Sequence, residues 1–195
     1  MNNNSLKKLK QDIVFKTRLR GHDFVFYSTW GLFNPKSVDE GSQLLIDTVD
    51  VAPDARVLDI GCGYGPLGLA LAKLAPSGTT HMVDKDFVAV DYAQKNAYAN
   101  KTKNVTVYLS NGLSAVPVGT AFDLIVSNLP AKVGNELLSI IMHDAKTHLK
   151  PGGRLCVVTI SGLKTYIKRN FIGIFGNYKK LKQGKTYTVA QAVNE

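Results

Sequence analysis

The sequence has only two cysteines and no long apolar run, and each shortage excludes a class of protein. Cys62 and Cys156 are too few for a disulfide framework and lack the spacing of metal ligands, so we expect two reduced thiols and no metal site. No apolar stretch approaches the ~18 residues that a membrane span needs. The first residues carry charges with no apolar stretch behind them, which argues against a secretion signal. We therefore expect a cytoplasmic protein with no membrane partner.

Acidic residues are scarce at the two ends of the chain. The protein has 195 residues and a formal net charge of +9 at pH 7. Residues 1–20 and 161–195 together hold 13 of the 24 lysines and arginines but only 2 of the 15 acidic residues. This concentration raises the local potential toward polyanions and favours RNA or DNA as a partner, although a solvated, solubilising surface has the same composition.

The length and the apolar content fit one domain. A hydrophobic content of 45% in 195 residues is enough for a single buried core. We expect a flexible basic arm over residues 1–11 and one folded domain over residues 12–195.

Short apolar runs alternate with helical segments from Ala55 onward. Strand followed by helix, repeated, predicts an α/β fold of the Rossmann-like kind, a mostly parallel sheet with helices on both faces. In the last predicted helix, Leu137, Ile141, Ala145 and Leu149 lie on one face. The predicted strands are 56–60, 80–84, 105–109, 122–127 and 154–159, and the predicted helices are 66–75, 87–100 and 134–150.

Two flanking segments depart from this alternation. Residues 12–29 are typical of a strand pair around a turn that begins at Arg20, and a helix follows from about Asp39, a suitable N-cap. Residues 178–193 are typical of a final antiparallel hairpin around Gln183-Gly184, which brings the predicted sheet to seven strands. A ligand is expected where the loops at the carboxyl ends of the central strands converge.

A glycine-rich loop follows the first predicted strand of the sheet. In DIGCGYGPLG, residues 59–68, Gly61, Gly63 and Gly65 permit a tight turn with the backbone close to a ligand. Asp84 ends the next strand, 21 residues after Gly63, where a ribose-binding acid is expected. The loop by itself fits a nicotinamide dinucleotide as well as S-adenosylmethionine.

Three further features favour S-adenosylmethionine. Asp59 precedes the glycines, Asn111 ends the third strand, and SNLP, residues 127–130, ends the fourth. A sulfonium donor needs a carboxylate and backbone groups around its zwitterionic amino acid, and an acid on its ribose, in place of a phosphate cradle. The plainer interpretations are a strand-end carboxylate that caps local amides for Asp59 and an ordinary turn for Asn111.

Five segments together resemble the class I S-adenosylmethionine-dependent methyltransferases: VLDIGCGYGPLGLALAK, VDKD, SNG, FDLIVSNLP and LKPGGRLCVV. The upstream GLFNPKSVDEGSQLLID, residues 31–47, is similar to the segment before the cofactor loop in the small-domain methyltransferases. That group contains the bacterial ribosomal RNA guanine-N2 methyltransferases and their single-domain relatives. The resemblance covers about residues 12–190. It implies S-adenosylmethionine as the cofactor, held by Asp59, Gly61, Cys62, Gly63, Gly65, Asp84, Lys85, Asn111, Gly112 and Asn128.

The fourth-strand motif carries the chemistry that this resemblance implies. The family usually has Asn-Pro-Pro-aromatic, where this chain has Asn128-Leu129-Pro130-Ala131. An exocyclic amine is a poor nucleophile because its lone pair is delocalised into the base. The Asn128 side-chain oxygen and the Leu129 carbonyl would accept its two hydrogens and direct the lone pair at the methyl carbon. The implied catalytic residues are therefore Asn128, Leu129 and Pro130.

Ala131 departs from the motif because it cannot stack on a flipped base. Phe33 or Trp30 would supply that surface, although aromatic residues are more often part of a core. The implied substrate-binding residues are Phe33, Ala131 and Lys132.

The sequence thus predicts a methyltransferase for an exocyclic amine of RNA, with guanine N2 of ribosomal RNA as the first choice. Two alternatives stay open. Related motifs serve protein side-chain amides and small molecules, and Ala131 is compatible with a catalytically silent, cofactor-binding RNA-interaction module. A dehydrogenase is a more distant alternative.

Overall fold

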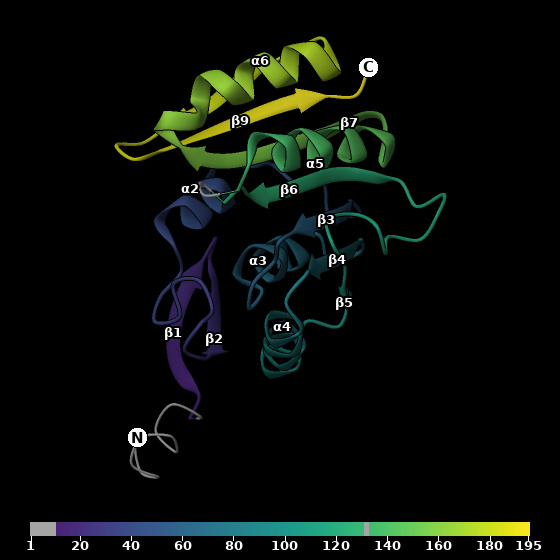
Figure 1. Cartoon of the computed structure of the whole chain (residues 1–195). Coiled ribbons are helices and arrows are strands. Elements are labelled where there is room, and N and C mark those ends of the chain that lie inside the picture. The colour runs from purple at the N-terminus through teal and green to yellow at the C-terminus, as the bar shows by residue number, and fades with distance from the viewer. Residues whose placement is uncertain (1–10, 131–132) are drawn as a thin grey trace.

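The computed structural model describes residues 11–130 and 133–195, which form a seven-stranded sheet covered by helices (Figure 1). The predicted basic arm therefore lies outside the described residues, except for Gln11, and stays a prediction. The strands of the sheet are β3 (Arg56–Ile60), β4 (Thr79–Asp84), β5 (Val105–Leu109), β6 (Phe122–Asn128), β7 (Leu149–Ile160), β8 (Lys179–Gln183) and β9 (Tyr187–Val193).

The strand order confirms the predicted Rossmann-like fold. The order is β5-β4-β3-β6-β7-β9-β8, and β3 to β7 pair in parallel. β9 is antiparallel to both β7 and β8, which confirms the predicted final hairpin. The order reverses between β3 and β6, so the carboxyl ends of these two strands flank a crevice of the kind that binds ligands in open α/β sheets.

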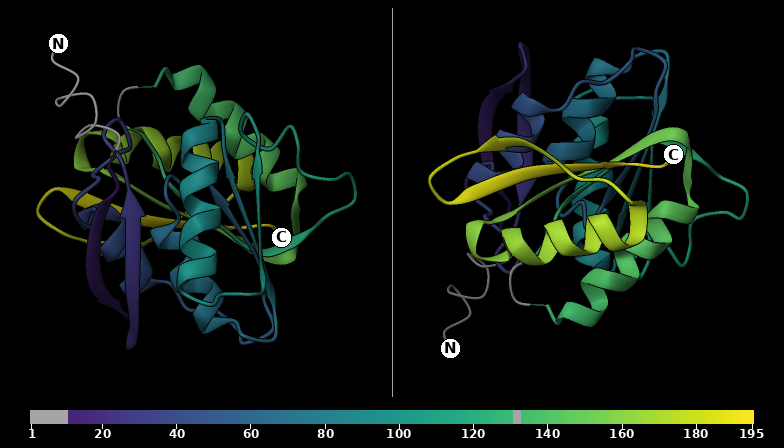
Figure 2. Two further views of the ribbon diagram at one scale, coloured as in Figure 1. Left: turned by 90° about the horizontal axis from the view of Figure 1, so that it is seen from below. Right: turned by 90° about the horizontal axis from the view of Figure 1, so that it is seen from above.

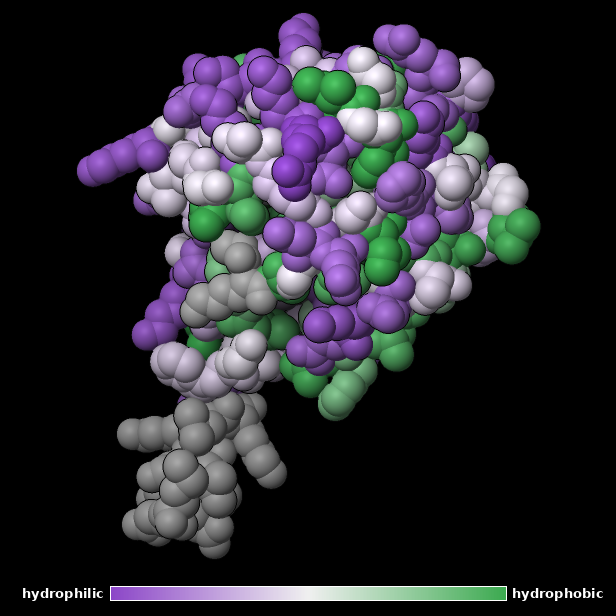
Figure 3. Space-filling view, turned by 45° about the horizontal axis from the view of Figure 1, so that its top comes forward, coloured by the Kyte–Doolittle hydropathy of each residue, from purple (hydrophilic) through white to green (hydrophobic). Residues whose placement is uncertain are grey.

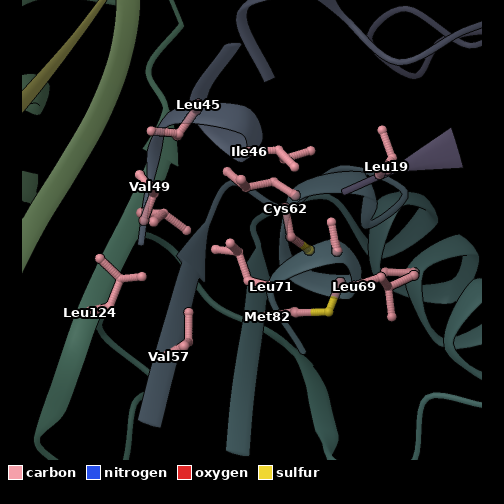
Figure 4. Packing of buried hydrophobic residues seen from close by; sticks show 14 of the residues in the cluster. Leu19, Leu45, Ile46, Val49, Val57, Cys62, Leu69, Leu71, Met82 and Leu124 are labelled. Carbon is pink, nitrogen blue, oxygen red and sulfur yellow. The ribbon is translucent and has the colours of Figure 1, made fainter. Parts of the chain in front are cut away.

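Helices cover both faces of the sheet, as expected, and each face has its own hydrophobic core. Helix α2 (Glu40–Thr48), α3 (Pro66–Leu74) and α4 (Phe87–Ala99) pack on one face, where Leu45, Val57 and Met82 lie in one cluster (Figure 4). On the other face lie α5 (Asn135–Thr147) and α6 (Lys164–Phe175) (Figure 2). Their buried side chains form the second cluster with Phe122 and Leu155. A short 3-10 helix, residues 161–163, leads into α6.

The predicted N-terminal strand pair is confirmed as a separate antiparallel sheet of β1 (Ile13–Leu19) and β2 (His22–Ser28). Backbone groups on the outer edge of β2 form hydrogen bonds with side chains of α4. The Asn96 amide bonds the backbone N–H and C=O of Tyr27 at 2.7 and 2.8 Å, and the Asn100 amide bonds those of Val25 at 2.9 and 2.8 Å. Two asparagines one helical turn apart thus replace a neighbouring strand and fix the hairpin to the domain.

The structure differs from the predicted helices in two places. The helix predicted at 134–150 ends at Thr147, and Leu149, predicted on its apolar face, begins β7 instead. His148 leaves the helical conformation, and its carbonyl accepts the N–H of Phe122 at 2.8 Å, which starts the strand pairing early. Helix α6 was not predicted, although its buried Ile167, Phe171 and Phe175 recur at the four-residue spacing of a helix.

Within the described part of the chain, no helix has both the length and the apolar character that crossing a bilayer requires.

Candidate active site

The predicted site residues meet at the carboxyl edge of the central strands. Asp59 lies near the end of β3, Asp84 ends β4, and Asn128 ends β6. The loop after β5 is tied to the same edge, because the Ser110 N–H donates to the Asp84 carbonyl at 2.8 Å. Asn111 is the next residue after Ser110, so this bond places it near Asp84. Asn111 is exposed.

The glycine loop turns sharply beside Asp84. Gly61 and Gly63 have φ angles of +71° and +56°, a region that only glycine adopts readily, and no atom lies within 4 Å of where their Cβ atoms would be. These two positions are therefore glycine because of backbone conformation. At Gly65 a Cβ would meet Met82 at 2.7 Å, so crowding adds to its positive φ of +97°.

Three amide hydrogens at the turn of this loop are used within the protein. Gly61 and Cys62 both donate to the carbonyl of Val83, at 2.8 and 2.9 Å, and Gly63 donates to Oδ2 of Asp84 at 2.9 Å. A pyrophosphate needs free N–H donors at such a loop. These three N–H groups are therefore not available to a pyrophosphate, whereas a cationic amino group can bond to carbonyl and carboxylate oxygens.

Asp59 is fully buried behind this loop. Its Oδ2 accepts the N–H of Gly68 at 2.8 Å, and among the described residues its Oδ1 has no hydrogen-bond partner. Burial raises the pKa of the carboxyl to about 7; the Gly68 bond opposes that rise, and the negative charge of Asp84 adds to it. Asp59 thus carries an acceptor that nothing in the described chain satisfies.

Asp84 holds the glycine loop and can accept further hydrogen bonds. Its Oδ2 binds Gly63, and its Oδ1 accepts the N–H of Asp86 at 3.0 Å. A carboxylate has about four lone-pair sites, so two remain for a ligand. Lys85 is exposed. Phe87, at the start of α4, is 68% exposed and was not among the predicted site residues.

Cys62 has its side chain in the hydrophobic core. It is 4% exposed and lies beside α2 and α3 (Figure 4), and burial raises the pKa of its thiol well above the ordinary value. Only its backbone can therefore face a ligand. Among the described residues, no group of three or more histidine, cysteine or acidic side chains is placed to hold a metal ion.

Asn128 is held by a network of hydrogen bonds that the sequence does not reveal. Its Nδ2 donates to Oδ2 of Asp39 at 2.9 Å and to Oγ of Ser42 at 3.0 Å. Asp39 also caps α2, accepting the N–H groups of Gly41 and Ser42, and its Oδ1 accepts the Tyr187 hydroxyl at 3.1 Å. The N-cap role of Asp39 was predicted, but its contact with Asn128 left no signal in the local sequence.

The residues after Asn128 are described only in part. The N–H of Leu129 donates to the carbonyl of Val158 at 3.0 Å, and the Leu129 side chain is buried, so the backbone here is anchored to β7. Pro130 is exposed. Ala131 and Lys132, two of the predicted substrate-binding residues, lie outside the described residues.

An exposed aromatic segment borders this network. Phe33 is 68% and Trp30 51% exposed, so the alternative that they are core residues is wrong. The Tyr64 hydroxyl, in the glycine loop, bonds to the carbonyl of Ser37 at 2.8 Å and to that of Asn34 at 3.2 Å. These bonds fix the segment that contains Phe33 against the glycine loop. A shallow cleft of about 480 Å³ is lined by Phe33, Asn34, Ser37, Val38, Asp39, Glu40 and Tyr187.

The C-terminal basic residues lie on the described surface. Ile160 pairs with Tyr187, so the turn between β8 and β9 projects at the same sheet edge as Asn128. Lys182, near the end of β8, and Lys185, within the turn, are both exposed. On the face seen in Figure 3, hydrophilic residues are interspersed with hydrophobic ones.

Residues 23–191 match the family model named Methyltransferase small domain. The chain belongs to this methyltransferase family. Its most similar relatives include the uncharacterized protein YbxB of Bacillus subtilis (strain 168), 40% identical over 155 residues, which are 79% of this chain and 76% of that protein. The ribosomal RNA small subunit methyltransferase C of Hamiltonella defensa is 32% identical over 193 residues, 94% of this chain and 56% of that protein.

A solved structure of the same kind has the same fold. The 16S rRNA N2 G1207 methyltransferase of T. thermophilus, in complex with AdoMet and guanosine, aligns with a TM-score of 0.85 and 29% identity. The alignment covers 93% of this chain and 50% of that one, so the chain spans about half the length of these rRNA methyltransferases. The methyltransferase small-domain family confirms the predicted enzyme class, and the predicted cofactor, S-adenosylmethionine, agrees with the AdoMet of the T. thermophilus structure.

Proposed function

We propose that this chain transfers a methyl group from S-adenosylmethionine to an exocyclic amine of RNA, and specifically to guanine N2 of ribosomal RNA. The observation that carries the proposal is the orientation of Asn128. A carboxylate accepts hydrogen bonds and cannot donate them, so the amide nitrogen must face Asp39 and the amide oxygen must face away from it. An amine hydrogen needs such a free acceptor.

This orientation suits the reaction of a weakly nucleophilic amine. The Asn128 oxygen would accept one amine hydrogen and the Leu129 carbonyl the other, which leaves the nitrogen lone pair to face the methyl carbon. When bound, the cofactor supplies a methyl group on a sulfonium whose sulfur departs as a neutral thioether. The new C–N bond forms as the C–S bond breaks, and the excess proton of the amine passes to solvent. Alignment of donor and acceptor is the main contribution of the protein.

The cofactor residues of the proposal fit a sulfonium amino acid. The N–H groups of Gly61, Cys62 and Gly63 are occupied, which favours a cationic amino group over a phosphate at the turn of the loop. Asp59 lies buried behind the loop with one unpartnered oxygen among the described residues. Asp84 would bind the ribose. The other proposed contacts are the backbones of Gly61, Cys62, Gly63 and Gly65, with Lys85, Asn111, Gly112 and Asn128.

The RNA part of the proposal rests on charge, on the exposed aromatic segment and on the relatives. The T. thermophilus neighbour carries guanosine, and the H. defensa relative is named for ribosomal RNA of the small subunit. Phe33 beside the cleft would give a base the stacking surface that Ala131 lacks. A ribosomal RNA substrate agrees with the cytoplasmic location predicted from the sequence.

Asn128→Ala tests the proposal. Loss of one positioned acceptor should lower the methylation rate about 10²-fold or more, while RNA affinity changes by far less. The measurements are transfer of labelled methyl groups to RNA under single-turnover conditions, and mass spectrometry of modified nucleosides from RNA of a strain without the gene. Equal methylation by wild type and Asn128→Ala contradicts the role of Asn128. Methylation of a protein or small molecule but of no RNA favours that alternative, and no methylation favours the silent module.

A further inference from the structure

We infer that Asp39 is a positioning residue for methyl transfer: it fixes which end of the Asn128 amide faces the substrate. The inference rests on the proposed function for its effect on rate, but its structural part does not. Asp39 is 8% exposed and binds the Asn128 nitrogen at 2.9 Å, from a position 89 residues earlier in the chain.

The chemistry of the two partners gives Asp39 this role. The oxygen and nitrogen of an asparagine amide are nearly equal in size, so packing alone does not choose between the two orientations. Ser42, the other partner of the Asn128 nitrogen, has a hydroxyl that donates or accepts, and it tolerates both. Of these two partners, the Asp39 carboxylate alone rejects the reversed amide, in which two acceptor oxygens would face each other. A reversed Asn128 would present N–H groups to the amine and repel its hydrogens.

Asp39 is itself held on three sides. Its Oδ2 accepts the N–H groups of Gly41 and Ser42 at 2.9 and 3.2 Å, and its Oδ1 accepts the hydroxyl of Tyr187 from β9. A Cβ on Gly41 would lie 2.9 Å from both Oδ2 of Asp39 and the Tyr187 ring, so glycine at this position allows the close approach. The carboxylate therefore has little freedom to follow a reversed amide.

The test separates this orienting role from the helix cap. Asp39→Ser keeps a preferred N-cap residue but has too short a side chain to cap α2 and reach Asn128 together. Asp39→Asn keeps an oxygen at the Oδ2 position for the cap and for Asn128, and it presents its NH₂ to Tyr187, whose hydroxyl can accept. Asp123→Ser is the matched control: Asp123 also binds a backbone N–H, that of Arg56 at 2.8 Å, and it lies at the opposite end of β6.

We expect Asp39→Ser to lower kcat about tenfold or more, with KM for RNA and the Kd for S-adenosylmethionine changed by less than about threefold. Asp39→Asn should keep at least about a third of kcat, and Asp123→Ser should lower thermal stability without this fall in kcat.

In an Asn128→Ala background, Asp39→Ser should reduce kcat by less than about twofold further, because the two residues act as one unit. Equal losses of kcat in both backgrounds, or full loss in Asp39→Asn, would overturn the inference.

A second measurement does not depend on methyltransferase activity. The Asn128 side-chain NH₂ resonances, assigned by their absence in Asn128→Ala, should be protected from hydrogen exchange in wild type and in Asp39→Asn and unprotected in Asp39→Ser. Protection that persists in Asp39→Ser overturns the inference even if wild type methylates RNA. If no RNA is methylated by wild type but this pattern of protection is seen, the proposed function fails while the orienting role of Asp39 holds.

Discussion

One carboxylate oxygen of Asp59 accepts the backbone N–H of Gly68 at 2.8 Å, while its other oxygen has no partner among the described residues. The bond ties the end of β3 to the first turn of α3, across the glycine loop. Because the unpartnered oxygen is buried, the charged form of Asp59 is disfavoured, and the pKa of the carboxyl rises from 3.8 to about 7.

The raised pKa of Asp59 predicts a pH dependence of stability. Between about pH 4 and pH 7 the folded protein keeps the Asp59 proton that the unfolded chain releases. The folded state then binds more protons, so the contribution of Asp59 to the free energy of unfolding falls as pH rises through this window and is constant above it. The expected loss is on the order of a few kcal/mol. Urea unfolding of wild type and Asp59→Asn, without cofactor, from pH 4 to pH 8 measures it as the difference between the two curves. Parallel curves would show that Asp59 is already charged at low pH.

Asp84 is expected to contribute to binding of S-adenosylmethionine. Asp84→Ala should weaken binding by about 1.5–3 kcal/mol, the range for hydrogen bonds to a charged group, because the ribose and the Gly63 N–H both lose their acceptor. Isothermal calorimetry with S-adenosylmethionine, its demethylated product and NAD measures this. Asp86→Ala is the control, since this exposed carboxylate caps α4 and should affect stability more than affinity. Binding of NAD in place of S-adenosylmethionine would refute the cofactor assignment.

Phe33 is expected to stack on the substrate base. Phe33→Ala should weaken RNA binding by about 1–3 kcal/mol, and Phe33→Tyr should keep wild-type affinity. The side chain is 68% exposed, so the free energy of unfolding should change by less than about 0.5 kcal/mol. Fluorescence anisotropy with labelled RNA gives the affinity. The matched control is Tyr98→Ala, which removes an aromatic side chain that is 90% exposed on α4. Equal affinities for Phe33→Ala and wild type would exclude the stacking role.

The basic turn between β8 and β9 is expected to bind RNA phosphates. Reversal of Lys182 and Lys185 to glutamate should flatten the slope of log affinity against log salt by roughly 1.5, since each phosphate contact contributes about 0.7 to 0.9. Reversal of Lys101 and Lys103, which are exposed near the amino end of β5, changes the net charge equally and should leave the slope closer to that of wild type. Identical slopes for the two double variants would show that the lysines of the turn contribute to solubility and do not contact phosphates.

The sequence by itself determined the fold class and the backbone frame of the site. Strand and helix periods, the glycines of the cofactor loop and the turn residues of both hairpins are local patterns, because each is imposed by the conformation of a few neighbouring residues. They placed Asp59, Asp84 and Asn128 at the ends of strands, and parallel pairing then required those ends to meet. Boundaries were less certain where local signals compete: Leu149 continues a helical period but pairs as a strand.

Only the tertiary structure decided how Asn128 is held. Asp39 lies 89 residues before it, and Tyr187 lies 148 residues after Asp39, so no local pattern connects the three. The same applies to the exposure of Phe33 and to the fixing of its segment by Tyr64. Contacts of this kind depend on how helices and strands pack, because packing brings together donors and acceptors that lie far apart in the sequence.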